Sequence, residues 1–172
     1  NIDPILDHLQ GVLDAAESKP IDQGPLLAFE SKFSTLWLRQ PFIADEHLKV
    51  DRSSNAMIPV KRLGDNIKLW FAGKVEDPRN GGELWKTRLQ RWARDKDVFN
   101  NLGEEKVETT LWEMFCFLHN VHTKGDWYIF YIRDTQGILR AVDAIWNSEV
   151  TAGWLIHANE INLPAGNNPK MC

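Results

Sequence analysis

The chain has 172 residues, of which 43% are hydrophobic and 26% charged, and its formal net charge is −4. This size and mixture fit one folded domain with a sizeable core and leave little room for a second domain. A net negative charge argues against a protein that coats nucleic acid through its phosphates, because that mode normally needs a basic surplus, but it leaves room for a small basic pocket that reads one nucleotide.

The cysteines and the apolar runs indicate in which cellular compartment we expect the protein. Cys116 lies within an apolar helical pattern and Cys172 is the last residue, so we expect no disulfide framework. The longest apolar runs are too short to cross a bilayer, and no signal-peptide pattern opens the chain. These features indicate a protein of the cytosol or the nucleus, without membrane contact.

Tryptophan is unusually frequent, with 8 Trp against only 2 Tyr. Large aromatic side chains serve either the core or a binding platform. Eight indoles exceed what a core of this size commonly uses, and this number favours a stacking site.

The first part of the chain mixes helical and extended patterns. Apolar residues recur at helical spacing through residues 2–13, and Pro20 follows, so residues 1–18 predict an amphipathic helix. We therefore expect residues 1–20 to form an N-terminal helical extension of a single domain that covers residues 1–172. A strand is predicted at 34–38, ended by Pro41, and a short helix at 44–50.

From residue 66 onward the pattern is mainly extended. Residues 66–71 and 84–89 predict two strands, and the turn signal between them makes a hairpin with a long loop. A short helix is predicted over 91–101. Residues 104–120 place their apolar side chains on one helical face and predict a longer helix.

The last part predicts a second hairpin and a final helix. Strands at 126–133 and 138–146 flank the turn sequence DTQG. Residues 150–161 predict a helix that ends before Pro164. The sum is an α+β fold in which antiparallel strands carry three or four helices on one face.

Alternation along the second hairpin places an arginine among aromatic or apolar side chains in each strand. One strand face carries Trp127, Ile129, Tyr131 and Arg133, and one face of the next carries Arg140, Val142, Ala144 and Trp146. Arginine matches phosphate geometry and aromatic rings stack on bases, so this is a candidate phosphate clamp beside a platform. The alternative is that both arginines are solvent-face charges that flank a turn.

Two further groups of residues are weaker candidates for a functional site. Glu76 and Asp77 are either turn acids or the carboxylate that accepts two hydrogen bonds from a guanine edge. Cys116, His119 and His122 recur every third residue and are either metal ligands or ordinary helix residues. No Gly-rich phosphate loop, nucleophile elbow or HExxH sequence occurs, so we expect neither enzymatic activity nor a cofactor.

Seven short segments occur along the chain in an order that is more informative than any one of them. They are SSNAMIP at 53–59, LGDNIKLW at 63–70, the acidic pair and NGGELW within 76–85, TLWE at 110–113, IR at 132–133, AIWN at 144–147 and NLP at 162–164. In this order they resemble the translation initiation factor 4E family, which binds the cap of messenger RNA. The string SSNAM can also be left by a cleaved affinity tag, but here it matches the family's own turn.

The resemblance implies a curved antiparallel sheet with about three helices on its convex face and a cap slot on the concave side. In the family, 7-methylguanine lies between two tryptophans, held by cation–π attraction. By position, the cap-binding residues are Trp70 in the stack, Glu76 on the guanine edge, Trp146 at the methyl group, and Arg133 and Arg140 on the phosphates. Leu84 replaces a basic residue of the family, which shifts phosphate contact to Lys86 or Arg88.

The resemblance also implies partners. The family binds capped messenger RNA in translation initiation or its regulation, and a helix of a 4G-like scaffold or of a 4E-binding repressor docks on the convex back, where Trp112 would contact it. We expect no DNA partner. The alternative is a protein-interaction module of the same fold that has lost cap binding, because residues 37–53 supply no clear second stacking aromatic.

Overall fold

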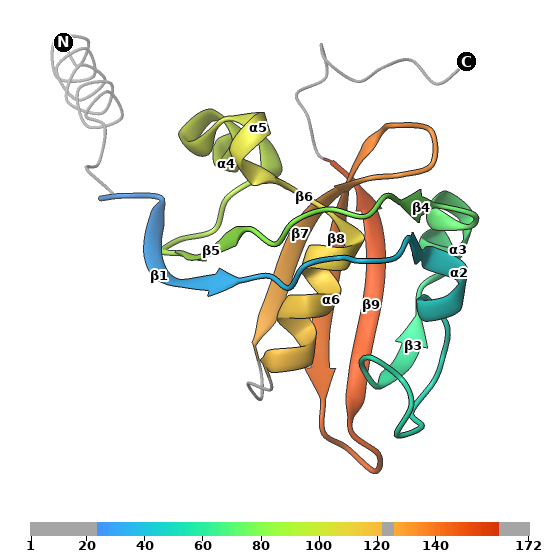
Figure 1. The fold of residues 1–172 in the computed structure, drawn as a ribbon. Helices are drawn as coiled ribbons and strands as arrows, with labels where there is room; N and C mark the ends of the chain where they lie inside the picture. Colours follow the sequence, from blue (N-terminus) through green and yellow to red (C-terminus); the bar gives the residue numbers. More distant parts are fainter. Residues whose placement is uncertain (1–23, 122–125, 162–172) are drawn as a thin grey trace, which may run out of the picture.

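The computed structural model describes residues 24–121 and 126–161 (Figure 1). The predicted helix over 1–18 lies outside these residues. In chain order the elements are β1 (Leu27–Ser34), β2 (Phe42–Ile43), α2 (Ala44–His47), β3 (Val60–Leu63), α3 (Asp65–Phe71), β4 (Val75–Glu76), β5 (Glu83–Leu89), α4 (Asp95–Leu102), α5 (Glu104–Val107), β6 (Glu108–Thr109), α6 (Leu111–Asn120), β7 (Trp127–Arg133), β8 (Leu139–Asn147) and β9 (Gly153–Glu160).

The described strands form one five-stranded sheet and two two-stranded pairs, which confirms an α+β fold. The sheet has the order β3-β9-β8-β7-β6, and its two edge strands, β3 and β6, run parallel to their neighbours. β1 and β5 form a separate antiparallel ribbon, and β2 pairs with β4. The expectation of an antiparallel sheet is therefore wrong at both edges, because β3 and β6 join the sheet by crossovers and not by hairpins.

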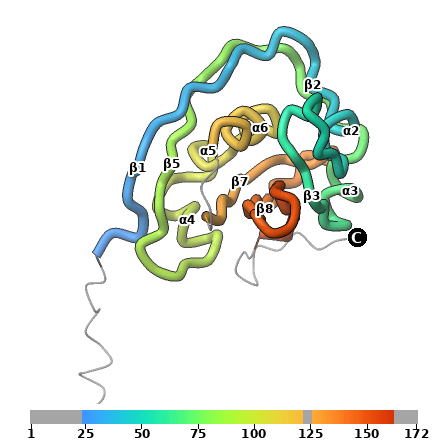
Figure 2. Tube along the Cα trace, turned by 90° about the horizontal axis from the view of Figure 1, so that it is seen from below, coloured from blue at the N-terminus to red at the C-terminus, as the bar shows by residue number. Residues whose placement is uncertain are grey.

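Helix α6 lies between the five-stranded sheet and the β1–β5 ribbon (Figures 1 and 2). Its Phe117 ring is 5.7 Å from the Phe33 ring of β1 and 5.0 Å from the Tyr128 ring of β7, so one side chain touches both layers. Six of the ten side chains of α6 are buried, and they include Met114 and Leu118. A helix that is apolar on most sides is expected to be covered on most sides.

The opposite face of the sheet is partly covered as well. Val98 of α4 and Val107 of α5 form a second buried cluster with Tyr131, Leu139 and Ala141. Because neighbouring side chains of a strand point to opposite faces, this cluster lies across the sheet from Phe130, Ile132 and Val142, which pack in the main core with α6. The expectation that helices cover one face only is wrong.

Two sequence-based elements have the wrong type. Residues 66–71 belong to helix α3 and not to a strand: Ile67 and Phe71 are four positions apart and both fully buried, which is the helical spacing. Residues 150–161 contain strand β9 and not a helix. There Trp154, Ile156 and Ala158 are buried with a period of two.

Two other elements are displaced or divided. The strand expected at 34–38 lies at Leu27–Ser34, and it pairs with β5, so the hairpin expected between residues 66–71 and 84–89 is absent from the described residues. The helix expected over 104–120 divides into α5, β6 and α6 at Thr110, which caps α6. The strand at 84–89, the second hairpin, and the short helices near 44–50 and 91–101 are confirmed.

None of the helices in the described part of the chain is both long and apolar enough to span a bilayer.

Candidate functional site

Trp70 and Arg140 form the closest contact among the residues predicted to bind a cap. Trp70 lies in the last turn of α3, and the guanidinium carbon of Arg140 on β8 is 3.9 Å from the centre of its indole ring. A guanidinium over an aromatic face is a cation–π pair. The two residues are 70 positions apart in the chain and meet because α3 packs at the end of the sheet where β7 turns into β8.

The turn between β7 and β8 fixes this pair. Asp134 begins the turn, and its buried carboxylate accepts hydrogen bonds from the backbone N–H groups of Gln136 and Ile138 and, at 2.9 Å, from Nε of Arg140. Thr135 donates from both its backbone N–H and its hydroxyl to the carbonyl oxygen of Trp70. The turn therefore binds Arg140 through the Asp134 carboxylate and the end of α3 through Thr135.

The Arg140–Asp134 pair is almost fully removed from solvent. Their side chains are 8% and 1% exposed, and Glu160 at the end of β9 lies 3.8 Å from the Arg140 guanidinium. A buried charge needs a partner with good geometry, and here the carboxylate and the indole face supply it. Sequence reasoning missed Asp134, although an Asp at the first position of a DTQG turn is a known signal for side chain to backbone bonds.

Arg133 lies on the other face of the sheet. In the β7–β8 register Ile132 is opposite Arg140 and Arg133 is opposite Leu139, so the two arginines point to opposite faces. Arg133 is half-buried and pairs with Glu108 at 2.9 Å and with Glu104 at 3.3 Å. The hydrogen bond to Glu108 raises the pKa of Arg133. The two arginines therefore do not converge on one phosphate chain in this arrangement.

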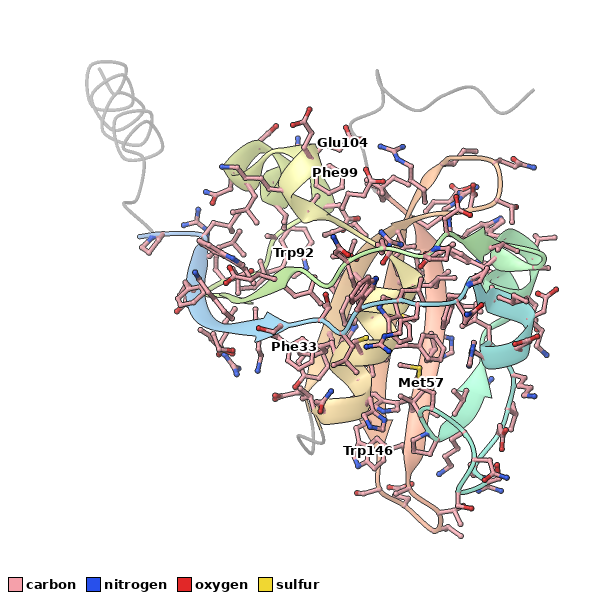
Figure 3. All side chains as sticks on the ribbon, viewed as in Figure 1. Phe33, Met57, Trp92, Phe99, Glu104 and Trp146 are labelled. Carbon is pink, nitrogen blue, oxygen red and sulfur yellow. The ribbon has the colours of Figure 1, made fainter. Side chains whose placement is uncertain are left out.

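Trp146 lies on the same face as Arg140 but six residues further along β8, a distance of roughly 20 Å at the usual rise of a strand. Its ring packs edge-on against the fully buried Trp154, with 5.1 Å between the centres. Figure 3 shows Trp146 at one end of the sheet and Glu104, a partner of Arg133, at the other. Trp146 is thus separate from both arginines.

Glu76 is buried and bound to the start of α6. Its two carboxylate oxygens accept the backbone N–H of Leu111 at 2.8 Å and of Trp112 at 3.0 Å. Arg79 forms an ion pair with the same carboxylate at 3.2 Å. In this arrangement Glu76 satisfies helix donors that would otherwise lack a partner.

The remaining predicted contacts lie on other surfaces. Lys86 and Arg88 of β5 share the carboxylate of Glu30 on β1, and Lys86 Nζ also lies 5.3 Å from the Tyr128 ring. Trp112 is half-buried in the first turn of α6, where its indole N–H donates to the carbonyl oxygen of Leu36 at 2.9 Å. Of the five residues predicted to hold the cap, Trp70 and Arg140 are in contact, and the other three lie apart from them.

Two of the candidate metal ligands, Cys116 and His119, lie on α6 and differ in exposure. Cys116 is buried, which raises the pKa of its thiol, whereas His119 is exposed and its Nδ1 lies 2.7 Å from the carbonyl oxygen of Met57. His122 lies outside the described residues. Within residues 24–121 and 126–161 no group of three His, Cys, Asp or Glu side chains is placed to hold a metal ion.

No protein-family model matches the chain, and no curated protein or solved structure is significantly similar to it.

Proposed function

We propose that the protein binds the 7-methylguanosine cap of messenger RNA at Trp70 and acts in translation initiation or its regulation. One observation carries the proposal: the Trp70 indole holds a planar, delocalised cation, the Arg140 guanidinium, 3.9 Å from its centre. A 7-methylguanine base is also planar and positively charged, so it can be attracted to the face of the Trp70 indole by the same cation–π interaction. The ordered resemblance of the seven sequence segments is the second support.

In this proposal the slot lies where α3 meets the turn between β7 and β8, at the end of the sheet face that packs against α6. It therefore differs from the slot that the resemblance implies, which lies on the concave side, away from the helices. The base stacks on the exposed part of the half-buried Trp70 side chain, whose remainder packs against the main core and the Arg140 guanidinium. Arg140 keeps its bond to Asp134 and contributes a fixed positive charge for the triphosphate. The proposal gives Glu76 no direct contact with the base, because its carboxylate already serves α6.

The experiment is a tryptophan fluorescence titration with 7-methyl-GTP, with unmethylated GTP as the control. We expect saturable quenching by 7-methyl-GTP and affinity about tenfold or more lower for GTP, because the unmethylated base lacks the positive charge. Trp70→Ala should remove the quenching, and Trp127→Ala, which changes an exposed indole on another surface, should retain it. Equal quenching by both nucleotides, or none by either, would contradict cap binding.

A second candidate is a protein-interaction module of the same fold. It is favoured by the engagement of Glu76 with α6 and by the separation of Arg133 and Trp146 from Trp70. The surface that supports it is formed by half-buried Trp112 and the exposed Leu36 and Trp37, which the bond between the Trp112 indole and Leu36 brings together. Its occupant would be a helical peptide with an apolar face, such as a 4G-like scaffold or a repressor supplies.

A further inference from the structure

The β1–β5 ribbon and its flanks carry a charge opposite to that of the rest of the chain. We call this the ribbon surface and define it as residues 27–39 and 79–94. It contains seven basic residues, Lys32, Arg39, Arg79, Lys86, Arg88, Arg91 and Arg94, and two acidic residues, Glu30 and Glu83. The whole chain has 20 basic and 24 acidic residues, so 13 basic and 22 acidic residues remain elsewhere. The ribbon surface is therefore a local basic region in an acidic protein.

Large aromatic side chains are exposed on the same surface. Trp37 is 59% exposed, Trp85 62% and Trp92 80%, and Phe29 contacts Trp85 edge-on with 5.4 Å between ring centres. Exposed indoles on a folded domain mark interaction sites when they cluster.

A cation lies over each of the three indoles. Lys32 Nζ is 4.9 Å from the ring centre of Trp85, the Arg39 guanidinium is 5.5 Å from Trp37, and the Arg94 guanidinium is 5.8 Å from Trp92. Each pair thus offers an aromatic face for a base and, next to it, a positive charge for a phosphate.

The two acidic residues of the ribbon surface are neutralised within it. Glu83 pairs with Lys32 at 3.4 Å, and Glu30 pairs with both Lys86 and Arg88. From outside the ribbon surface, Glu76 pairs with Arg79 and Asp126 lies 3.9 Å from Lys86. Four carboxylates thus stand against seven basic residues, so the surface retains a positive surplus.

The ribbon is accessible along its length. In the β1–β5 register Lys32 is opposite Trp85, and both side chains are exposed, whereas neighbouring Phe33 and Leu84 pack toward the core. Figure 2 shows β1 and β5 running along the outside of the molecule, beyond α6. Trp85 therefore points away from the protein interior, and Trp37 and Trp92, which follow β1 and β5 in the chain, are exposed as well.

We propose that the ribbon surface binds single-stranded RNA without sequence preference, by stacking bases on Trp37, Trp85 and Trp92 and pairing phosphates with the neighbouring cations. Single-stranded sites combine these two features, because every base has a face for stacking and every nucleotide a negative charge. The inference goes beyond cap binding and is independent of it: the RNA needs no cap, and the ribbon residues are not those at Trp70. A surface that extends along the whole ribbon also suits an RNA strand better than a single nucleotide.

The test measures fluorescence anisotropy of a labelled, uncapped single-stranded RNA of about ten nucleotides. We expect Trp85→Ala and Trp92→Ala each to weaken binding about tenfold, since one stacked base contributes roughly 1–3 kcal/mol. Trp127→Ala is the matched control, because this indole is 63% exposed on β7, outside the ribbon surface, and its loss should leave the affinity unchanged. Trp85→Phe keeps a stacking face and should retain most of the affinity.

Salt and strandedness complete the test. Affinity should fall steadily as salt is raised, because phosphate contacts release counterions. A duplex of the same sequence should bind more weakly, because its base faces are hidden. Absence of RNA binding by the wild type, equal loss in Trp127→Ala, or a helical protein partner bound at Trp85 in place of RNA would each overturn the proposal. Trp70→Ala should leave uncapped RNA binding intact, so failure of the cap proposal is a separate result.

Discussion

The carboxylate of Glu76 accepts the backbone N–H of Leu111 at 2.8 Å, across 35 positions of the chain, and so joins β4 to the first turn of α6. The same carboxylate accepts from Trp112, and the Thr110 hydroxyl accepts from the backbone N–H of Glu113. Three consecutive donors at the helix start are thus satisfied by side chains, and the negative charge is at the favourable end of the helix dipole.

We expect Glu76→Ala to lower the free energy of unfolding by about 2–3 kcal/mol, because it leaves one buried and one partly buried helix donor without their charged acceptor. The measurement is urea denaturation. Asp77→Ala is the control: Asp77 is the exposed neighbour of Glu76 and should leave stability nearly unchanged. A fully stable Glu76→Ala protein that no longer binds 7-methyl-GTP would instead place Glu76 at the cap.

The two arginines of the second hairpin should differ in their effect on stability. Arg140→Ala leaves Asp134 buried without its cation and should cost about 3 kcal/mol or more. Arg133→Ala removes half-exposed pairs with Glu108 and Glu104 and should cost about 1 kcal/mol or less. Denaturation midpoints of the two variants measure the difference, and equal costs would contradict the different burial of the two pairs.

The half-buried Trp112 can be tested as a partner contact. If a helical peptide docks there, Trp112→Ala should abolish capture of a 4G-like partner and leave quenching by 7-methyl-GTP at Trp70 intact. Trp112→Phe keeps the ring packing near Phe42 but removes the N–H that bonds to Leu36, so it separates packing from the hydrogen bond. Loss of both activities together with aggregation would show that Trp112 serves the core alone.

The adjacent glycines Gly81 and Gly82 should respond differently to alanine. A Cβ on Gly81 would collide with the backbone carbonyl oxygen of Thr35, whereas a Cβ on Gly82 would meet only the Thr35 hydroxyl at 3.9 Å, an ordinary contact. We expect Gly81→Ala to cost about 1–3 kcal/mol, as overpacking does, and Gly82→Ala to have little effect. Thermal unfolding of both variants checks this, and a harmless Gly81→Ala would mean that the chain is not so close at Thr35.

His47 should make stability depend on pH. Burial lowers its pKa, Lys49 lowers it further and Glu46 raises it, while its ring stacks on Phe42 with 4.6 Å between centres. The unfolded chain then binds the proton more readily than the folded one. This contribution is therefore complete above the unfolded value of about 6.5 and is lost as pH falls through the lower folded pKa.

The measurement compares melting temperatures near neutral pH and about one unit below the ordinary histidine pKa. We expect wild type to lose more stability over this interval than His47→Gln, which cannot take up the proton. The comparison cancels every other pH-dependent contribution, because the two proteins differ only at residue 47. An equal loss in the two proteins would remove His47 as the source.

The second hairpin was predictable from the sequence because its signals are local. Alternation from Trp127 to Arg133 and the DTQG turn fix both strands and their connection. Helix α3 was not, since its seven residues contain too few apolar positions to separate a helix from a buried strand. β9 was misread for a different reason: its partners β3 and β8 are set by tertiary pairing, and its own pattern is short.

The candidate site shows the same division between local and long-range information. Which residues share a face within one strand follows from alternation alone. How β7 and β8 align across the hairpin does not, and a shift of one residue moves a side chain to the other face. Arg133 and Arg140 are each correctly assigned to a strand, yet the register places them on opposite sides of the sheet. The contact between Trp70 and Arg140 depends on how α3 packs, which no local pattern specifies.

The position of β9 within the sheet has a consequence for biosynthesis. β9 is the last strand of the described chain, yet it lies between β3 and β8, and Val60 of β3 pairs with Trp154, 94 positions later. During synthesis on the ribosome, β3 therefore emerges long before β9, its neighbour in the sheet of the described residues. The edge of β3 that pairs with β9 and the apolar side of α3 must wait for residues 153–160, so the nascent chain needs protection until Gly153–Glu160 has left the ribosome.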